Sequence, residues 1–274
     1  MRRRELFSEG VATLREARIE SASTAVRLFL AFVLGKEEFQ EKEVSSANIE
    51  QFRALIAHHK IGYPVSKLIG CRYFWDKPFF VDINVLDPRP DSETLIEAIL
   101  QTVPADFSGK VLDFGTGSGC LLETLLIHCP HMQGIGVDCS QQALQIAQKN
   151  AVHLGVIDRA HFVCSNWGKA LNQRRKFDVI LSNPPYIARK EIPTLPRSVA
   201  LYDPFIALDG GEDGLACYRD LVPSIRHFLR LHGHVFLEID KGQQEAVKEI
   251  FNFLFYLEGY RDLSGKVRVL HFSS

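Results

Sequence analysis

Apolar residues recur at helical spacing through the first seventy residues and in short, strand-length runs after them. The early part predicts three short amphipathic helices, of which the second ends at Gly35 and the third ends at 62–64, a Gly-Tyr-Pro sequence. Asn48 is the N-cap that we expect for the third helix. Helices of this kind bury their apolar faces against one another, so the pattern predicts a small helical bundle.

Aromatic and β-branched residues then replace the helical pattern. Runs at 71–75 and 79–85 flank an Asp-Lys-Pro sequence at 76–78, which predicts a β-hairpin with its turn at these three residues. We therefore expect an N-terminal helical bundle over 1–72, a hairpin linker over 73–89 and a second domain over 90–274.

In the second domain, apolar runs of strand length alternate with amphipathic segments of helix length. The expected strands lie at 110–114, 134–137, 162–163, 178–181 and 233–239. The expected helices lie at 120–128, at 141–153 after a Ser140 cap, and from about 214. This alternation predicts an α/β fold, a Rossmann-like, doubly wound parallel sheet with helices on both faces.

A glycine loop follows the first strand of this domain. It consists of Gly115, Thr116, Gly117, Ser118 and Gly119 and precedes a helix, so backbone N–H groups can approach a ligand closely. Asp138 lies 19 residues after Gly119, at the end of the next strand, where a carboxylate can bind ribose hydroxyls. The spacing is G-x-G-x-G and differs from the dinucleotide pattern G-x-G-x-x-G, which favours S-adenosylmethionine over NAD.

A second motif, Asn183-Pro184-Pro185-Tyr186, follows the strand at 178–181. Two prolines end the strand and supply no N–H, which leaves the Asn183 side-chain oxygen and the carbonyls of Asn183 and Pro184 as acceptors beside the Tyr186 ring. Such a group of acceptors suits a planar NH2 group. The alternative is an Asx-type turn in which the prolines only end the strand.

Charge and cysteine spacing narrow the class of protein. The chain has 32 basic and 33 acidic residues, and the region through Glu43 has eight of each, so the balance favours neither nucleic acid nor an anionic membrane as partner. We see no leader pattern and no apolar run of membrane-spanning length, and we expect a cytoplasmic protein. Six cysteines without a C-x-x-C pair predict buried free thiols and no metal site.

Together, the glycine loop, the Gly-Val-Asp sequence ending at Asp138 and the Asn-Pro-Pro-Tyr motif resemble the class I methyltransferases that modify planar NH2 groups. The segments 87–94, 202–204 and 207–215 further resemble the PrmC/HemK family, whose members methylate the glutamine of the Gly-Gly-Gln loop in class I peptide-chain release factors. The resemblance spans nearly the whole chain. It departs from the usual family pattern at Asp87, Ser92 and Asp240.

This resemblance implies roles for individual residues. The loop 115–119 and Asp138 are expected to bind S-adenosylmethionine, Trp167 to pack near its adenine, and Asn183 to lie between cofactor and substrate. Pro184, Pro185 and Tyr186 are expected to hold the glutamine amide, with Asn183, Pro184 and Tyr186 as the catalytic group. Arg89 is expected where substrate and cofactor meet. The alternatives are an ordinary core tryptophan at Trp167 and an exposed salt bridge at Arg89.

Two other functions fit parts of the pattern. The same tetrapeptide can bind the amine of a flipped adenine in DNA, although the sequence has neither a long target-recognition insertion nor an evident basic groove. A cofactor-binding protein without activity is the other alternative, and the complete Asn-Pro-Pro-Tyr motif argues against it.

Overall fold

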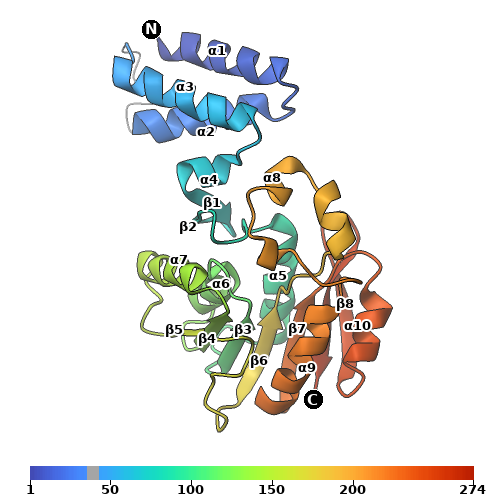
Figure 1. Ribbon diagram of the computed structural model, residues 1–274. Helices are drawn as coiled ribbons and strands as arrows, with labels where there is room; N and C mark the ends of the chain where they lie inside the picture. The colour runs from blue at the N-terminus through green and yellow to red at the C-terminus, as the bar shows by residue number, and fades with distance from the viewer. Residues whose placement is uncertain (36–42) are drawn as a thin grey trace. The chain divides into compact units, whose positions relative to one another are not determined.

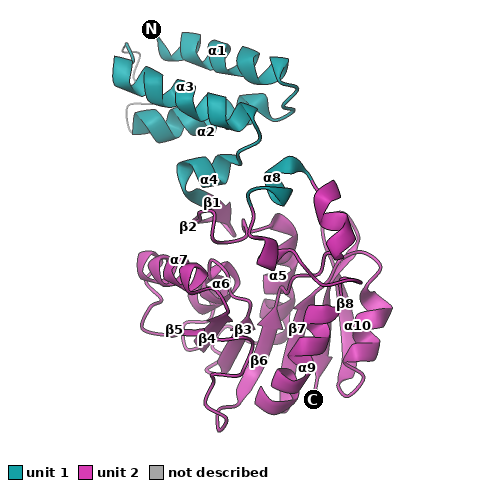
Figure 2. Ribbon diagram, in the orientation of Figure 1, with its two compact units in different colours: residues 1–71, 196–202 teal, residues 72–195, 203–274 magenta. Residues whose placement is uncertain are grey.

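The computed structural model describes residues 1–35 and 43–274. These residues form two compact units, one comprising 1–71 with 196–202 and the other comprising 72–195 with 203–274 (Figure 2). No helix in the described ranges is long and apolar enough to cross a membrane.

The first unit is helical. It contains α1 (Arg3–Glu16), α2 (Ala22–Leu34), α3 (Ser46–Lys60), α4 (Val65–Ile69) and the short α8 (Arg197–Ala200). Its core is built from apolar side chains of the first three helices, among them Leu6, Leu14, Phe29 and Phe52. A methyl group on Gly10 of α1 would lie 2.7 Å from Phe52 of α3, so a glycine allows these two helices to approach closely.

The cap of α3 differs from our prediction. Ser45 is the N-cap, and its Oγ accepts a hydrogen bond from the Asn48 backbone N–H at 3.2 Å. Asn48 is therefore already inside the helix, and the prediction was wrong because two residues with good capping side chains lie three positions apart. The predicted end of α2 at Gly35 is confirmed, with φ +54° at that glycine.

The hairpin has a tighter turn than predicted. Strands β1 (Cys71–Phe74) and β2 (Lys77–Phe80) form a two-stranded sheet, and the turn consists of Trp75 and Asp76. Both turn residues have positive φ, +50° and +59°, as in a type I′ turn. Pro78 consequently lies inside β2, so the predicted turn at 76–78 was wrong.

The second unit is built on a seven-stranded sheet with the order β5-β4-β3-β6-β7-β9-β8 (Figure 1). Its strands are β3 (Lys110–Phe114), β4 (Gln133–Asp138), β5 (Ala160–Cys164), β6 (Phe177–Ser182), β7 (Leu229–Glu238), β8 (Phe255–Arg261) and β9 (Val267–Ser273). The pairings from β5 through β7 are parallel, which confirms the prediction. Strands β8 and β9 pair antiparallel, an ending that the strand and helix alternation did not predict.

Helices cover both faces of this sheet. On one face, α5 (Glu93–Thr102), α6 (Cys120–His128) and α7 (Gln141–His153) pack against Val111, Val179 and Phe236. On the other, α9 (Ala216–Phe228) and α10 (Gln244–Ile250) pack against Leu112 and Ile180. Consecutive residues of one strand thus point to opposite faces of the sheet and pack into different cores, as the two-residue period of a strand requires. Short 3₁₀ helices η2 (Pro90–Ser92), η3 (Arg189–Thr194) and η4 (Phe205–Ala207) lie in the connecting segments.

Candidate active site

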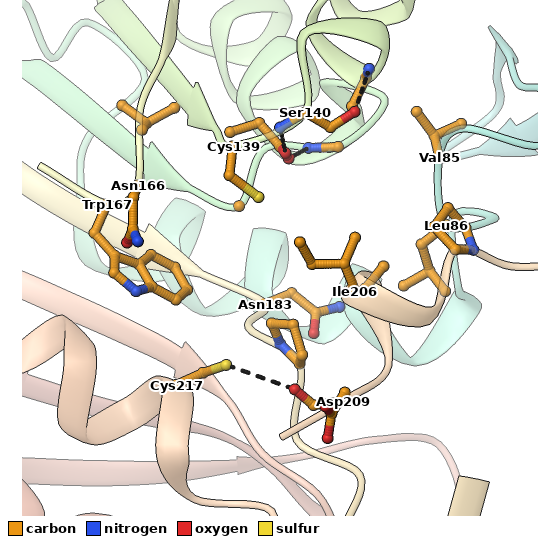
Figure 3. A pocket seen from close by; sticks show the side chains of 18 of the residues that line it. Val85, Leu86, Cys139, Ser140, Asn166, Trp167, Asn183, Ile206, Asp209 and Cys217 are labelled. Carbon is orange, nitrogen blue, oxygen red and sulfur yellow. Dashed lines mark hydrogen bonds between the residues drawn. The ribbon is translucent and has the colours of Figure 1, made fainter. Parts of the chain in front are cut away.

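A cavity of about 300 Å³ lies in the second unit, at the carboxyl ends of β3, β4 and β6. Its lining includes six of the residues singled out from the sequence: Gly115, Gly117, Asp138, Trp167, Asn183 and Pro185. Figure 3 shows Trp167 and Asn183 among the side chains around the cavity. The other predicted site residues lie outside this lining: Arg89, Thr116, Ser118, Gly119, Pro184 and Tyr186. The crevice beyond the carboxyl ends of parallel strands is where open α/β sheets bind ligands.

The glycine loop divides into residues that face the cavity and residues that shape the loop. Gly115 and Gly117 line the cavity and have φ of +75° and +55°, a conformation that side chains rarely adopt. Thr116 is buried and its Oγ1 donates a 2.6 Å hydrogen bond to Asp113 Oδ2. Gly119 has φ +82°, and a methyl group there would lie 2.1 Å from Glu123 Oε1 and 3.1 Å from Ala147 Cβ, so glycine is favoured where the loop enters α6. The buried Ser118 also shapes the loop, since its backbone carbonyl accepts a 2.9 Å hydrogen bond from Asn150 Nδ2.

Asp138, the last residue of β4, holds two neighbouring segments. Its Oδ2 accepts the Gly117 N–H and its Oδ1 accepts the Ser140 N–H, each at 2.9 Å. Ser140 in turn caps α7 through the Ala143 N–H, at 3.1 Å, as the sequence predicted. Each carboxylate oxygen has a further lone pair, so Asp138 can still accept hydrogen bonds from hydroxyl groups in the cavity.

Trp167 lies at the border between the cavity and the core. Its ring meets Phe114 edge to face, with 6.2 Å between ring centroids, and it also lines the cavity beside Asn166 and Ser165. The backbone is in the left-handed region, with φ +50°. A tryptophan in this position presents a flat apolar surface to a ligand while the core fixes its other side.

The Asn-Pro-Pro-Tyr motif begins directly after β6. Asn183 and Pro185 line the cavity, Pro184 is buried, and Asn183 Nδ2 donates a 3.0 Å hydrogen bond to Ser92 Oγ. The Tyr186 ring packs into the core next to α9, and its hydroxyl donates to Glu238 Oε1 at 3.4 Å. The structure thus brings the acceptors of Asn183, but not the Tyr186 ring, to the cavity wall.

Arg89 forms an ion pair rather than part of the lining. Its Nη2 lies 2.6 Å from Asp203 Oδ2, and the Asp203 side chain is buried. The Asp203 Oδ1 also accepts the Asp87 backbone N–H at 3.4 Å. This pair anchors the segment that follows, from which Pro204, Ile206 and Ala207 reach the cavity.

Several cavity residues were not found from the sequence. They come from loops, from the start of α7, from η4 and from α9: Asn84, Val85, Leu86, Cys139, Ser140, Ala143, Ser165, Asn166, Ile206, Ala207, Asp209, Cys217 and Asp220. The segment 207–215 resembles the family but had no assigned role, and the sequence pattern of the apolar loop residues did not indicate a binding site.

The prediction of buried thiols was wrong for most of the six cysteines, all of which lie in the described ranges. Cys129 is buried, whereas Cys139 and Cys217 line the cavity and Cys164 is exposed.

Buried carboxyl groups lie behind the cavity wall. Burial raises the pKa of Asp113 and that of Glu238 to about 7, opposed by hydrogen bonds from Thr116 and Ser92, respectively. Burial also raises the pKa of Glu123 well above its usual value. Within the described ranges, no group of three or more His, Cys, Asp or Glu side chains could hold a metal ion.

The residues present fit S-adenosylmethionine. Gly115 and Gly117 leave room for a ligand beside the loop, Asp138 offers acceptors for ribose hydroxyls, and the Trp167 ring offers a surface for adenine. Apolar side chains such as Val137 and Ile206 complete the wall.

Comparisons with known proteins agree with this geometry. Residues 90–196 match the family described as "Methyltransferase small domain", and residues 5–70 match the "PrmC N-terminal domain". A release factor glutamine methyltransferase of Caulobacter vibrioides is 35% identical over 243 residues, 87% of this chain and 84% of that protein. One of Agrobacterium fabrum is 37% identical over 277 residues, 98% of this chain and 94% of that protein. The solved structure of a methyltransferase from Pyrococcus furiosus aligns with a TM-score of 0.52 at 18% identity, over 81% of this chain and 96% of that one.

Fold and cavity together define a class I S-adenosylmethionine-dependent methyltransferase, which confirms the predicted fold class and cofactor. The similarity to these two relatives covers 84% and 94% of their length and also identifies the family. The chain belongs to the release factor glutamine methyltransferase family, and the resemblance to PrmC/HemK proteins is confirmed.

Proposed function

We propose that this protein transfers a methyl group from S-adenosylmethionine to the side-chain amide nitrogen of glutamine in the Gly-Gly-Gln loop of class I peptide-chain release factors. The observation that carries the proposal is that Asn183 lines the same cavity as Gly117 and Asp138. A site for the methyl donor and an acceptor for a planar NH2 group are therefore within one cavity. Membership of the release factor glutamine methyltransferase family supports the choice of glutamine.

The cofactor is proposed to lie along the carboxyl ends of β3 and β4. The loop 115–119 would bind it through backbone groups, Asp138 would accept hydrogen bonds from its ribose, and Trp167 would pack against its adenine. When bound, S-adenosylmethionine supplies a methyl group on a sulfonium, which already has a good leaving group. What the chain must supply is alignment, and positioning of reacting groups contributes on the order of 7 to 11 kcal/mol in favourable cases.

The glutamine amide is proposed to bind at Asn183 and the following prolines. An amide nitrogen is a poor nucleophile because its lone pair is delocalised into the carbonyl. Oxygen acceptors at Asn183 and Pro184 would orient both N–H groups and stabilise the positive charge that develops on nitrogen. No strong base is required, since a methylated amide nitrogen is acidic enough to lose its proton to water.

Tyr186 and Arg89 are proposed to act beside this centre. Tyr186 would support the amide site from behind the cavity wall, because its partly buried ring packs into the core and its hydroxyl donates to Glu238. The ion pair of Arg89 with Asp203 supports a role in holding the segment that carries Ile206. Arg89 would thus shape the region where substrate and cofactor meet.

Recognition of the release factor is proposed to depend on residues 1–72, with 73–89 as linker and 90–274 as the methyltransferase domain. Two or three hydrogen bonds to an amide add little net affinity, about 0.5 to 1.5 kcal/mol each, because each replaces a bond to water. Contacts remote from the amide must then supply most of the binding, and such contacts raise turnover as well as affinity. A substrate that takes part in translation also supports a cytoplasmic location.

The full chain should be incubated with labelled S-adenosylmethionine and three acceptors: an intact release factor, a short peptide of its Gly-Gly-Gln loop, and an adenine-containing oligonucleotide. We expect one added methyl group on the loop glutamine of the intact factor, much slower transfer to the peptide, and none to the oligonucleotide. Equal rates for factor and peptide would refute recognition by a remote surface. Preferential labelling of adenine would refute the function itself, and no transfer to any acceptor would favour the inactive alternative.

A further inference from the structure

The backbone of the segment 207–215 lies directly against the end of the Asn-Pro-Pro-Tyr motif. The Ile187 N–H, which follows the motif, donates to the Leu208 carbonyl at 3.1 Å. Gly214 has φ +76°, and a methyl group there would lie 2.5 Å from the Tyr186 carbonyl oxygen. Glycine is therefore favoured at position 214, because a side chain would push the segment away from the motif.

The side chain of Gln243 joins this contact to the segment that follows β7. Its Nε2 donates to the Tyr186 carbonyl at 2.9 Å and to the Gly214 carbonyl at 3.1 Å. Its Oε1 accepts the Asp240 backbone N–H at 3.0 Å. The three hydrogen bonds use both ends of the carboxamide, and turning it around would place its oxygen against two carbonyl oxygens. These contacts therefore fix the direction of the Gln243 carboxamide.

The Asn-Pro-Pro-Tyr motif depends on contacts at its two ends. At its start, the Ser182 hydroxyl donates to the Phe114 carbonyl at 2.7 Å. Asn183 Nδ2 donates to Ser92 Oγ at 3.0 Å. The two prolines that follow have no N–H to donate to a neighbouring segment. The path of the backbone through the motif is therefore set largely by the residues that hold its ends, and Gln243 holds the far one.

We propose that Gln243 is a positioning residue for methyl transfer, which keeps the Asn183 acceptor in place by holding the Tyr186 carbonyl. The proposal rests on the proposed function and gives the segment 207–215 a part in it, as the second partner of Gln243. Gln243 lies outside the cavity lining, so its effect should reach the reaction only through the motif. Because the chain contributes alignment of the reacting groups, a small displacement of the acceptor should slow transfer.

The first test compares Gln243→Met with Gln173→Met in the full chain, with release factor as substrate. Methionine has nearly the length of glutamine but makes none of the three hydrogen bonds. Gln173 is the matched control, because its Nε2 also donates to a backbone carbonyl, that of Leu171 at 2.9 Å, outside the cavity lining. With rates expressed per cofactor-binding site, Gln243→Met should lower kcat by about 5- to 50-fold and change the cofactor Kd by less than about 3-fold. Gln173→Met should leave kcat within about 2-fold of the parent.

A second comparison tests the glycine that packs on the motif. Gly214→Ala places a methyl group against the Tyr186 carbonyl and should lower kcat while the cofactor Kd stays within about 3-fold. Gly155→Ala is the control, because Gly155 also has positive φ, +71°, but nothing lies within 4 Å of an added methyl group. Equal losses of kcat in the two variants would contradict the proposal, since strain at a positive φ would then explain both.

A double-mutant cycle separates positioning of Asn183 from a general loosening of the fold. If Gln243 acts through the Asn183 acceptor, adding Gln243→Met to Asn183→Ala should slow transfer by less than about 2-fold further. The same fold-loss in both backgrounds would overturn the proposal, because the effect of Gln243 would then not pass through Asn183.

A spectroscopic measurement tests the positioning without turnover. The ¹⁵N resonance of the Asn183 side-chain amide, identified by its loss in Asn183→Ala, should move in Gln243→Met and stay constant in Gln173→Met. An unmoved resonance in Gln243→Met, or kcat within about 2-fold of the parent, would overturn the proposal. An unaltered enzyme that does not methylate release factor refutes the proposed function instead, and the resonance still decides whether Gln243 positions Asn183.

Discussion

Replacement of Asp138 by alanine tests the assignment of the cofactor site. In the structure, the carboxylate accepts the Gly117 and Ser140 N–H groups, each at 2.9 Å, and it lines the cavity. The change therefore removes two hydrogen bonds inside the protein and the proposed contact with ribose. Two measurable quantities should fall together, the cofactor affinity and the free energy of unfolding.

The expected size follows from these contacts. Hydrogen bonds to a charged group contribute about 1.5 to 3 kcal/mol, and loss of the ribose contact should weaken the cofactor Kd by about 10- to 150-fold. Partial exposure of Asp138 limits the stability effect, for which we expect a loss of about 1 to 3 kcal/mol. Asp138→Asn should be intermediate in stability, since the amide oxygen can still accept from Ser140 while its NH2 faces the Gly117 N–H.

Calorimetric titration with S-adenosylmethionine gives the Kd, and urea unfolding gives the stability. Asp158→Ala is the control, because Asp158 is an exposed carboxylate of the same unit outside the cavity lining. A Kd within 2-fold of the parent in Asp138→Ala, with reduced stability, would make Asp138 a purely structural residue. An unchanged Kd with unchanged stability would also contradict the hydrogen bonds on which the estimate depends.

Two further predictions concern other parts of the chain. Asn183→Ala should lower the rate of methyl transfer by at least about 100-fold and leave the cofactor Kd within about 3-fold, because the lost acceptor acts on the nucleophile. Transfer rates and calorimetric titration measure the two quantities, and a loss of cofactor binding alone would contradict the prediction. Burial and the neighbouring His234, whose Nδ1 lies 2.9 Å from His271 Nε2, lower the pKa of His271 to about 4. As the pH falls below about 6.5, His271 therefore becomes protonated in the unfolded chain before it does so in the folded protein. The stability that the neutral pair contributes is complete above pH 6.5 and declines toward pH 4, by at most about 1.4 kcal/mol per pH unit. Urea unfolding between pH 5 and 7 should show a shallower decline in His271→Gln, and equal slopes in both proteins would refute the shift.

Local patterns predicted most of the fold. The parallel strands and their helices followed from hydrophobic periodicity, which depends only on neighbouring residues. The hairpin turn did not, since Trp75 and Asp76 both adopt positive φ although neither is glycine or asparagine. The antiparallel pairing of β8 and β9 was also missed, because the direction of a strand depends on contacts across the sheet and not on its own sequence.

The same distinction explains which cavity residues were found. Gly117 and Asp138 are recognisable from the sequence because a glycine loop after one buried strand and an acidic residue at the end of the next form a known local pattern. Ile206 is not, since it reaches the cavity only where the ion pair of Arg89 and Asp203 joins segments 114 residues apart. Ser92 had been noted only as a departure from the family pattern, and its contact with Asn183 bridges 91 residues.

The order of the strands explains why the proposed cofactor site and the proposed acceptor site lie in one cavity. The chain runs from β3 outward to β4 and β5, then returns to place β6 on the other side of β3 (Figure 1). Between β3 and β6, the connections leave in opposite directions and open a crevice. The parallel registers bring four strand ends into one row, which carries Asp138, Gly115, Asn183 and Glu238 in that order. Asp138 and Gly115 lie at the proposed cofactor site, and Asn183 carries the proposed acceptor for the amide, so the two proposed parts of the site meet at the ends of β3 and β6. A substitution on one side should therefore alter either cofactor binding or transfer, and the contrast between Asp138→Ala and Asn183→Ala measures this separation directly.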